Sequence, residues 1–301
     1  MTGEGRLSYR ACRLCPRACG VDRTCGQRGF CGMGDRITAA RAALHFWEEP
    51  PISGTRGSGA VFFSGCSLGC RFCQNTEISH GRAGAEITTA RLREIFETLI
   101  AQGAHNINLV TATHFLPSIL PALTPKLPVP VVYNCGGYES VETLRALEGS
   151  VDIYLPDLKY AEADLAAQLS GAPDYFPVAC RAIDEMVRQT GPCVFGPDGM
   201  LQRGVVIRHL ILPGQVQNSL KVLDYVAGHF PGGTVLLSLM AQYVPSGSVK
   251  NMPPFDRTIT QEEYDAVVTW LYMLGLEDGF LQDCAAATDD YLPDFSLEGI
   301  L

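Results

Sequence analysis

The stretch Gly59-Ala-Val-Phe-Phe-Ser-Gly-Cys66-Ser-Leu-Gly-Cys70-Arg-Phe-Cys73 decides how the rest of the chain is interpreted. In it an apolar run, which predicts a buried strand, leads directly into three cysteines spaced Cys-x3-Cys-x2-Cys. Three thiolates this close can converge on one soft metal centre and leave a fourth coordination position without a protein ligand. A three-thiol zinc site and three unconnected cysteines are the alternative interpretations.

Length and charge narrow the class of protein. A chain of 301 residues, 47% hydrophobic, is long enough for one sizeable barrel-like domain. We expect that domain over residues 59–301, including a C-terminal tail, after a Cys-rich extension and connector over residues 1–58. The formal charge of -9 disfavours nucleic acid and anionic membranes as partners. The N-terminus lacks the pattern of an export signal and no long apolar run occurs, so we expect a cytoplasmic protein.

Cysteine is frequent and unevenly distributed. Eight of the 12 cysteines lie within the first 73 residues, at spacings typical of metal ligands. Disulfide scaffolds are normally small and secreted, so the pattern favours a reduced, metal-bearing protein. The scattered remainder, Cys135, Cys180, Cys193 and Cys284, reads as small buried apolar residues.

The N-terminal extension has almost no apolar periodicity and needs a cross-link to fold. Cys12, Cys15, Cys19 and Cys31 can close either a structural zinc site or a second iron–sulfur cluster with no open position, and Cys25 is then spare. The connector over residues 36–58 can include a strand. Its His45 reads as a packed histidine, and Glu48-Glu49-Pro-Pro as a solvated turn, neither of them catalytic.

Beyond residue 59, short β-branched runs alternate with helical patterns. The expected strands are 60–64, 106–111, 129–134, 151–156, 205–212 and 234–240. The expected helices are 88–102, 116–123, 141–147, 161–169 with 177–189, 216–228 and 261–274. Six strand–helix units imply parallel pairing through right-handed crossovers. The sequence therefore predicts an α/β fold, a partial (β/α)6 barrel with a Cys-rich N-terminal metal-binding extension.

Polar side chains follow the expected strands, at the carboxyl ends where barrels of this kind carry their chemistry. The cysteine triplet follows the first strand. The later strand ends bring Thr111, Thr113 and His114, then Asn134, then Asp157 and Lys159, then Leu212, and finally Gln242 and Tyr243. We therefore expect these residues to meet at one rim.

These motifs resemble a known superfamily. Cys-x3-Cys-x2-Cys with an aromatic residue before the last cysteine, Asp157-Leu-Lys159, Leu210-Ile-Leu-Pro-Gly and the N-terminal Cys15-Pro-Arg-Ala-Cys19 segment are similar to the activating-enzyme branch of the radical S-adenosylmethionine (SAM) enzymes. Over roughly residues 10–285 the chain most resembles uncharacterised homologues of the pyruvate formate-lyase activating enzyme. The resemblance implies an anaerobic oxidoreductase in which Cys66, Cys70 and Cys73 hold a [4Fe-4S] cluster and SAM chelates its fourth iron.

The resemblance also implies the reaction and its partners. Reductive cleavage of SAM gives a 5'-deoxyadenosyl radical that abstracts hydrogen from a substrate, for which a glycyl residue of a partner protein is one candidate. A flavodoxin or ferredoxin is the expected reductant. The alternatives are a radical SAM enzyme that acts on a small molecule or peptide with an auxiliary cluster, and a non-catalytic iron–sulfur or zinc sensor. A polar rim disfavours the sensor, because a sensor needs no SAM pocket.

The resemblance implies roles for single residues near SAM. Phe72 packs either on the adenine or within its own loop. Asn134 contacts the ribose or carboxylate, or it forms a turn. Asp157 accepts from the ribose hydroxyls and Lys159 neutralises the carboxylate, with a rim salt bridge as the alternative. Leu212 belongs to the backbone that approaches the adenine.

The second-strand loop departs from the superfamily pattern. Thr111, Thr113 and His114 stand where a Gly-Gly-Glu-like segment usually meets the SAM amino group. His114 is also a candidate proton donor or helix cap. Tyr243, with Gln242, is a candidate for substrate contact or a packed aromatic. Arg208 or His209 is expected to line the cavity.

Overall fold

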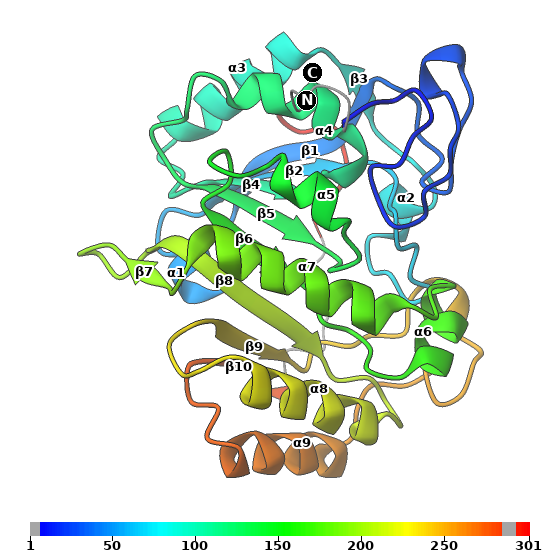
Figure 1. Cartoon of the computed structure of the whole chain (residues 1–301), viewed down its shortest axis with the longest axis vertical. Coiled ribbons are helices and arrows are strands. Elements are labelled where there is room, and N and C mark those ends of the chain that lie inside the picture. The colour runs from blue at the N-terminus through cyan, green and yellow to red at the C-terminus, as the bar shows by residue number, and fades with distance from the viewer. Residues whose placement is uncertain (1–6, 285–292) are drawn as a thin grey trace.

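The computed structural model describes residues 7–284 and 293–301, and within them ten strands form one sheet (Figure 1). In chain order the strands are β1 (Ile37–His45), β2 (Ser58–Phe63), β3 (Ala85–Ile87), β4 (Ile107–Val110), β5 (Val131–Cys135), β6 (Ile153–Pro156), β7 (Val194–Phe195), β8 (Leu201–Leu210), β9 (Leu236–Met240) and β10 (Gly279–Leu281). Each of the six predicted strands is confirmed, with ends shifted by a few residues.

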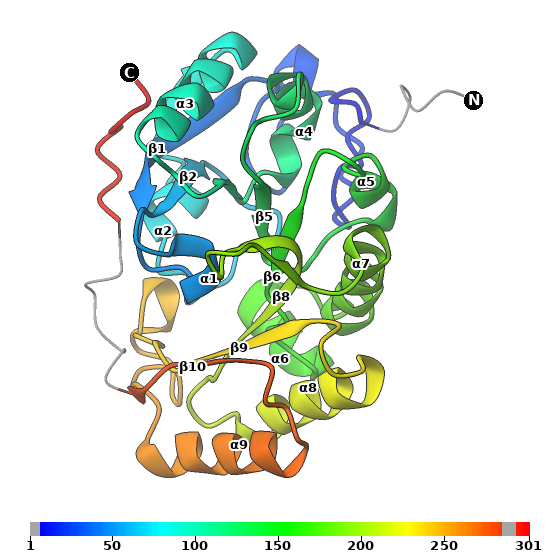
Figure 2. The ribbon, with the colours of Figure 1, turned by 90° about the vertical axis from the view of Figure 1, so that its left-hand side faces the viewer.

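The sheet is mostly parallel and open. Its order is β10-β9-β8-β6-β5-β4-β2-β1-β3, and along this order every neighbouring pair from β10 to β2 is parallel, while β7 lies off the path and pairs antiparallel with β8. Figure 2 shows the longer helices along the top, right and bottom of the strands and no such layer on the left, beside β1. Between β10 and β3 the described residues form no pairing that would close the ring. The predicted partial barrel is therefore confirmed, extended by β10 at one edge.

The connector between the N-terminal extension and the barrel is part of the sheet. Strand β1 pairs antiparallel with β2, and β3 pairs antiparallel with β1. The C-terminal segment lies against β1, where the Leu297 and Ala42 N–H groups bond the Ala40 and Glu298 carbonyls (Figure 2). The expected domain boundary after residue 58 stays a prediction.

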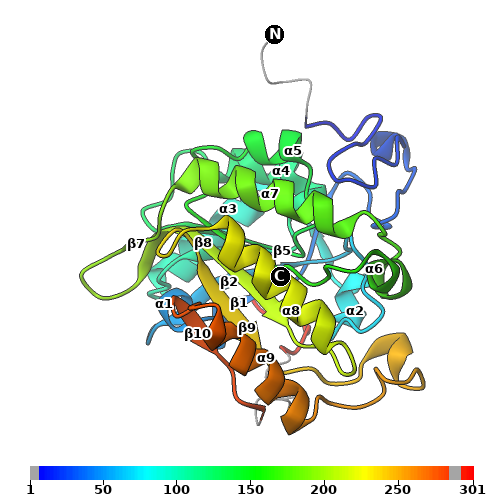
Figure 3. The ribbon, with the colours of Figure 1, turned by 60° about the horizontal axis from the view of Figure 1, so that its bottom comes forward.

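The helices pack against the sheet, most of them on its outer face (Figure 3). They are α1 (Pro50–Ser53), α2 (Thr76–Ser79), α3 (Thr89–Ala101), α4 (Leu116–Ile119), α5 (Val141–Arg145), α6 (Ala163–Ser170), α7 (Tyr175–Thr190), α8 (Val216–His229) and α9 (Gln261–Met273). All of the predicted helices are present. The expected openings at Thr88 and Thr260 are true N-caps, and Thr260 with Glu263 forms a capping box.

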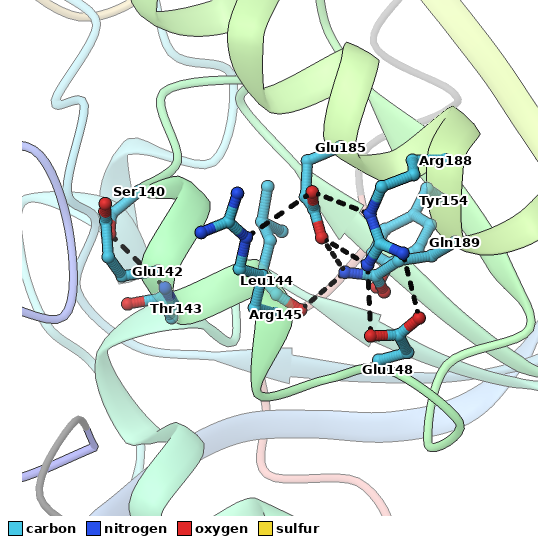
Figure 4. Close-up of polar contacts among 10 residues, drawn as sticks. All are labelled: Ser140, Glu142, Thr143, Leu144, Arg145, Glu148, Tyr154, Glu185, Arg188 and Gln189. Atoms are coloured by element: carbon cyan, nitrogen blue, oxygen red, sulfur yellow. Dashed lines mark hydrogen bonds and ion pairs between the residues drawn. The ribbon is translucent and has the colours of Figure 1, made fainter. Parts of the chain in front are cut away.

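A polar network ties α7 to α5 and β6 on this outer face (Figure 4). Arg188 donates to Glu185 on its own helix and to Glu148 beyond α5, at 2.8 Å and 3.0 Å. Gln189 accepts from the Tyr154 hydroxyl of β6 at 2.5 Å and donates to the Leu144 carbonyl at 2.9 Å. These bonds hold α7 across the strands, so that Tyr175 at its start is held close to the carboxyl end of β6.

Alternating positions of the parallel strands face opposite sides of the sheet. The side chains on the outer face of the sheet pack under the helices. The other set includes Val132, Ile153, Leu155, Val206 and Leu236, which pack with Ile52 of α1 to fill the inner face near the amino ends of the strands. Two residues further along, the same inner face carries Asn134, Asp157, Arg208 and Ser238. The inner face thus changes from apolar to polar toward the carboxyl ends, and this change positions the site.

Candidate functional site: a thiol-lined cavity at the strand carboxyl ends

A cavity of about 720 Å³ opens at the carboxyl ends of the parallel strands. Of the residues predicted to form the rim, it is lined by Cys66, Cys70, Phe72, Cys73, Thr111, Asn134, Asp157, Lys159, Gln242 and Tyr243. Its volume is in the range typical of small-molecule and cofactor sites. The tertiary structure thus brings together residues up to 177 positions apart in the chain, from Cys66 to Tyr243.

The three thiols lie on the loop between β2 and α2. Each sulfur has a hydrogen-bond donor: the Leu68 N–H at 3.4 Å from Cys66, the Ser170 hydroxyl at 3.3 Å from Cys70, and the Ser79 hydroxyl at 3.3 Å from Cys73. Burial, and then the neighbouring Cys70, raises the pKa of Cys66 to about 12. The Cys66 thiol therefore ionises readily only when a cation joins it.

The chemistry of this donor set fits an iron–sulfur cluster. Three soft ligands with hydrogen bonds to sulfur are what a cluster with one open iron requires. Within residues 7–284 and 293–301, no three His, Cys, Asp or Glu side chains already stand in a metal-binding arrangement. A bound cluster therefore requires the three thiols to turn toward a common point.

Asp157 and Lys159 form an ion pair inside the cavity. Lys159 Nζ lies 2.6 Å from Asp157 Oδ2, and both side chains are largely buried. Burial opposes the charge of Lys159, but Asp157 and then Cys70 outweigh it and raise the pKa of the ammonium group. Lys159 therefore stays cationic beside the thiols.

The backbone around this pair is held by close packing. The Tyr175 hydroxyl lies 2.8 Å from the Asp157 carbonyl oxygen and accepts from the Lys159 N–H at 3.0 Å. Gly137 has a φ of +77°, and a Cβ there would overlap the Asp157 carbonyl. Glycine is thus required where the β5 loop passes the Asp157–Lys159 segment.

A second charged cluster lies in the cavity wall, and of its members only Arg208 was expected there from the sequence. Arg208 makes a bidentate bond to Glu49, 2.7 Å for Nε to Oε1 and 2.7 Å for Nη2 to Oε2, and its Nη2 also bonds Glu48. Glu48 accepts from Asn108 at 2.9 Å and from Asn134 at 3.2 Å. We name Glu48, Glu49 and Arg208 the acidic wall.

The interpretation of Glu48-Glu49 as a solvated turn is therefore wrong. Their side chains are only 7% and 5% exposed, because α1 folds them onto the inner face of the sheet. A signal for this pairing was present: Arg208 stands within the apolar run Val205-Val-Ile-Arg-His, and a buried arginine needs a carboxylate.

The second-strand loop is divided between the cavity and the core. Thr111, with a φ of +60°, lines the cavity, whereas Thr113 and His114 are buried outside its lining. His114 Nε2 lies 2.7 Å from the Ser64 carbonyl, and burial lowers its pKa to about 4. A neutral, packed imidazole does not fit the role of a proton donor to substrate, so that part of the prediction is corrected.

Three further candidates take structural positions. Leu212 is a core residue, and Leu210 lines the cavity in its place. His209 is buried between the Leu158 carbonyl and the Ser219 hydroxyl, at 2.7 Å and 2.9 Å, while Arg208 faces the cavity. The Tyr243 hydroxyl donates to the Phe255 carbonyl at 2.7 Å, so its ring forms wall rather than offering a free hydroxyl.

The ring of Phe72 packs against the ring of Tyr243, and we name these two rings the aromatic wall. Its ring centroid lies 6.5 Å from that of Tyr160, which it meets edge-on, and 5.8 Å from that of Tyr243. Phe72 also lines the cavity. Packing within its loop is therefore present, and contact with an adenine stays a prediction.

A buried carboxylate, that of Glu139, lies outside the cavity lining. Glu139 accepts from the Thr113 hydroxyl at 2.8 Å and from the Tyr133 hydroxyl at 3.2 Å, and burial raises its pKa to about 7. Between pH 4.5 and 7 the folded chain then binds more protons than the unfolded chain, so this group lowers stability as the pH rises.

We expect Glu139→Gln, which mimics the protonated form, to be more stable than the wild type at pH 8 by about 1–3 kcal/mol. Near pH 5 the two proteins should differ little. Urea unfolding at the two pH values measures this difference. An equal advantage at both would show that Glu139 does not titrate in this range.

The N-terminal thiols also lie near one another. Burial is the main cause that raises the pKa of Cys15, to about 12. The charges of Glu139, Cys31 and Cys19 add to this shift. Burial also raises the pKa of Cys31, and the charges of Cys12 and Cys19 add to that shift. Among the described residues these four thiols do not stand in a metal-binding arrangement either, and their metal content stays a prediction.

Comparisons with known proteins agree with the cavity and the fold. A family model described as a 4Fe-4S single cluster domain matches residues 53–115, which contain Cys66, Cys70 and Cys73. The chain is 28% identical to the uncharacterized protein MJ0674 of Methanocaldococcus jannaschii over 267 residues, which are 85% of this chain and 73% of that protein.

Among solved structures, the chain resembles Streptococcus suis SuiB bound to S-adenosylmethionine, with a TM-score of 0.50 and 12% identity over 75% of this chain and 50% of that chain. The chain spans about half the length of SuiB. Methylornithine synthase (PylB) also matches, with a TM-score of 0.47 and 12% identity over 72% of this chain and 68% of that chain. The likeness to SuiB shows the α/β fold.

The helices were also compared with the length and apolarity needed to cross a membrane. In residues 7–284 and 293–301, no helix meets that requirement.

Proposed function

We propose that the chain is a radical SAM enzyme. The observation that carries this proposal is that all three thiols of the Cys-x3-Cys-x2-Cys motif open into one cavity with Asn134, Asp157 and Lys159. When bound, a [4Fe-4S] cluster with SAM on its open iron supplies a 5'-deoxyadenosyl radical that abstracts hydrogen from the substrate. The match of residues 53–115 to a 4Fe-4S domain supports the cluster, and the fold shared with a SAM-bound protein supports SAM.

The chain's own residues bind and orient the ligand. Lys159 offers its ammonium group to the ligand carboxylate, and Asp157, held 2.6 Å away, accepts from ribose hydroxyls. Thr111 offers a hydroxyl and a carbonyl to the amino group. The aromatic wall of Phe72 and Tyr243 excludes water on the side of the thiols.

The charge of the cavity supports a cationic ligand. The side chains of Glu48, Glu49 and Asp157 carry three negative charges against the positive charges of Arg208 and Lys159. SAM carries a sulfonium and an ammonium against one carboxylate, so its net charge complements the cavity.

The substrate and partners are part of the proposal. Hydrogen abstraction from a glycyl residue of a partner protein is the activity of the branch that the sequence resembles, and a small molecule or peptide is the alternative substrate. A flavodoxin or ferredoxin in the cytoplasm is the proposed reductant. The half-exposed Phe46 and Trp47 at the cavity edge offer apolar surface to either substrate.

The test is anaerobic reconstitution with iron and sulfide, followed by dithionite and SAM. We expect 5'-deoxyadenosine and methionine in equal amounts, measured by mass spectrometry. Deuterium transfer between labelled SAM and candidate substrates then identifies the hydrogen donor. Iron bound at the cysteine triplet without any 5'-deoxyadenosine would reject the enzyme in favour of a sensor.

A further inference from the structure

Arg17 lies between two of the N-terminal thiols and contacts the loop of the cysteine triplet. Its Nε donates to the Ser67 carbonyl at 3.0 Å, and its Nη2 donates to the Leu68 carbonyl at 3.0 Å. Both carbonyls stand between Cys66 and Cys70. Arg17 therefore holds the backbone that carries two of the three thiols.

The same guanidinium group reaches the end of α6. Arg17 Nη2 donates to the Ser170 carbonyl at 2.7 Å and Nη1 to the Gly171 carbonyl at 2.5 Å. A cation is favoured at these carbonyls because they end a helix. Ser170 is also the residue whose hydroxyl donates to Cys70 Sγ at 3.3 Å. One side chain thus joins the thiol loop to the donor that contacts its second sulfur.

Phe30 completes the contact from the other side. The Arg17 guanidinium stacks on its ring at 3.9 Å. Gly69 of the thiol loop has a φ of +66°, and a Cβ there would come within 3.0 Å of the Phe30 ring. Phe30 immediately precedes Cys31, and Arg17 stands two positions from both Cys15 and Cys19. Residues close to three N-terminal thiols therefore contact the thiol loop.

The N-terminal thiols share a local geometry with the triplet. The Leu68 N–H donates to Cys66 Sγ at 3.4 Å, and a backbone N–H likewise donates to a sulfur in the N-terminal segment. Phe30 N–H donates to Cys19 Sγ at 3.3 Å. Such N–H groups stabilise thiolates bound to a metal. Cys25 instead is exposed, with Asp22 Oδ2 3.6 Å from its sulfur.

We propose that Cys12, Cys15, Cys19 and Cys31 hold a thiophilic metal centre, zinc or iron–sulfur, and that Arg17 is a positioning residue that couples this centre to the thiol loop. The N-terminal metal keeps Arg17 and Phe30 in place, and they in turn hold the loop in the conformation that binds its cluster. The coupling rests on the proposed function, because it concerns a cluster at Cys66, Cys70 and Cys73. The N-terminal metal centre does not rest on it.

The first experiment measures the N-terminal metal by itself. In a Cys66→Ala, Cys70→Ala, Cys73→Ala background we expect metal to remain, as zinc or as iron with sulfide, measured by elemental analysis. Adding Cys15→Ser should remove it, whereas Cys25→Ser, a thiol of the same segment, should not. The N-terminal site would be overturned if Cys15→Ser and Cys25→Ser held equal amounts of metal, both in this background and in the otherwise wild-type chain.

The second experiment measures the coupling in the otherwise wild-type protein. Arg17→Gln should release iron from the triplet to a chelator about tenfold faster, because several charge-assisted hydrogen bonds are lost. Its cluster should also have a lower midpoint potential in an EPR-monitored titration, because a cation is removed. Arg13→Gln, an exposed arginine between Cys12 and Cys15, is the matched control. Arg17→Lys should recover the potential.

The outcomes separate the two proposals. Cys15→Ser should release triplet iron as fast as Arg17→Gln does, and Arg17→Gln should keep its N-terminal metal. Equal release rates and potentials for Arg17→Gln and Arg13→Gln would overturn the coupling. A wild-type chain that binds no cluster at the triplet would overturn the proposed function and the coupling together, while the first experiment would still decide the N-terminal metal.

Discussion

Replacing Arg208 by methionine should lower the free energy of unfolding by about 3–5 kcal/mol, since removing one partner of a buried ion pair leaves its charges uncompensated. The side chain of Arg208 is 13% exposed, and its two partners Glu48 and Glu49 are buried more deeply. Chemical unfolding at pH 7 measures the loss. Lys221→Met, which removes an exposed ion pair with Glu162, should cost at most about 1 kcal/mol and is the matched control.

The loss should depend on pH with a definite sign. Burial opposes ionisation of Glu49, but the charge of Arg208 outweighs burial and lowers its pKa. The pair therefore contributes its stability above the unfolded pKa of a glutamate, about 4.3, and the contribution falls as the pH drops through the folded value. In the variant, the carboxyl groups bind protons more readily, so the difference from the wild type should shrink below about pH 5.

A rescue distinguishes the charge from the packing of Arg208. Adding Glu48→Gln and Glu49→Gln to Arg208→Met should recover much of the lost stability, because no uncompensated charge then remains. If the triple variant is as unstable as Arg208→Met alone, the cost arises from lost packing and the acidic wall is not an electrostatic unit.

A Cys70→Ala variant should lose the cluster of the triplet and form 5'-deoxyadenosine more than about 100-fold more slowly than the wild type. The loss of a ligand exceeds the 10–100-fold cost typical of outer-shell changes at metal sites. Iron content, the visible absorption of the cluster and 5'-deoxyadenosine formation measure the effect after anaerobic reconstitution.

Cys180→Ala is the matched control for this variant. Cys180 lies on α7 outside the cavity lining, so its replacement should leave both iron content and SAM cleavage unchanged. Equal SAM cleavage by Cys70→Ala and the wild type would contradict the assignment of Cys70 as a ligand.

Much of the fold follows from local pattern. The apolar runs at 60–64 and 106–111 and the capped helices at Thr88 and Thr260 are readable because strand and helix signals depend on near neighbours. The short edge strands β3, β7 and β10 carry no such signal. They form because a longer neighbouring strand offers unpaired backbone groups, and for β3 and β10 that partner lies about 40–50 residues away in the chain.

The site divides in the same way. Asp157 and Lys159 could be predicted because two residues two apart at a strand end share one face. Three other features could not be predicted, because each depends on a contact with a residue at least 50 positions away. They are the burial of Glu48, the position of His114 outside the cavity and the bond of Arg17 to Ser170.

The sequence by itself determined a parallel α/β fold and a cysteine triplet after its first strand, because strand periodicity and ligand spacing are local properties. Only the tertiary structure decided which side chains share the cavity with that triplet. Folding of α1 onto the inner face of the sheet places Glu48 and Glu49 opposite Arg208, and packing of the N-terminal segment places Arg17 on the thiol loop. Such contacts arise when burial forces charged and polar groups to find partners, wherever in the chain those partners stand.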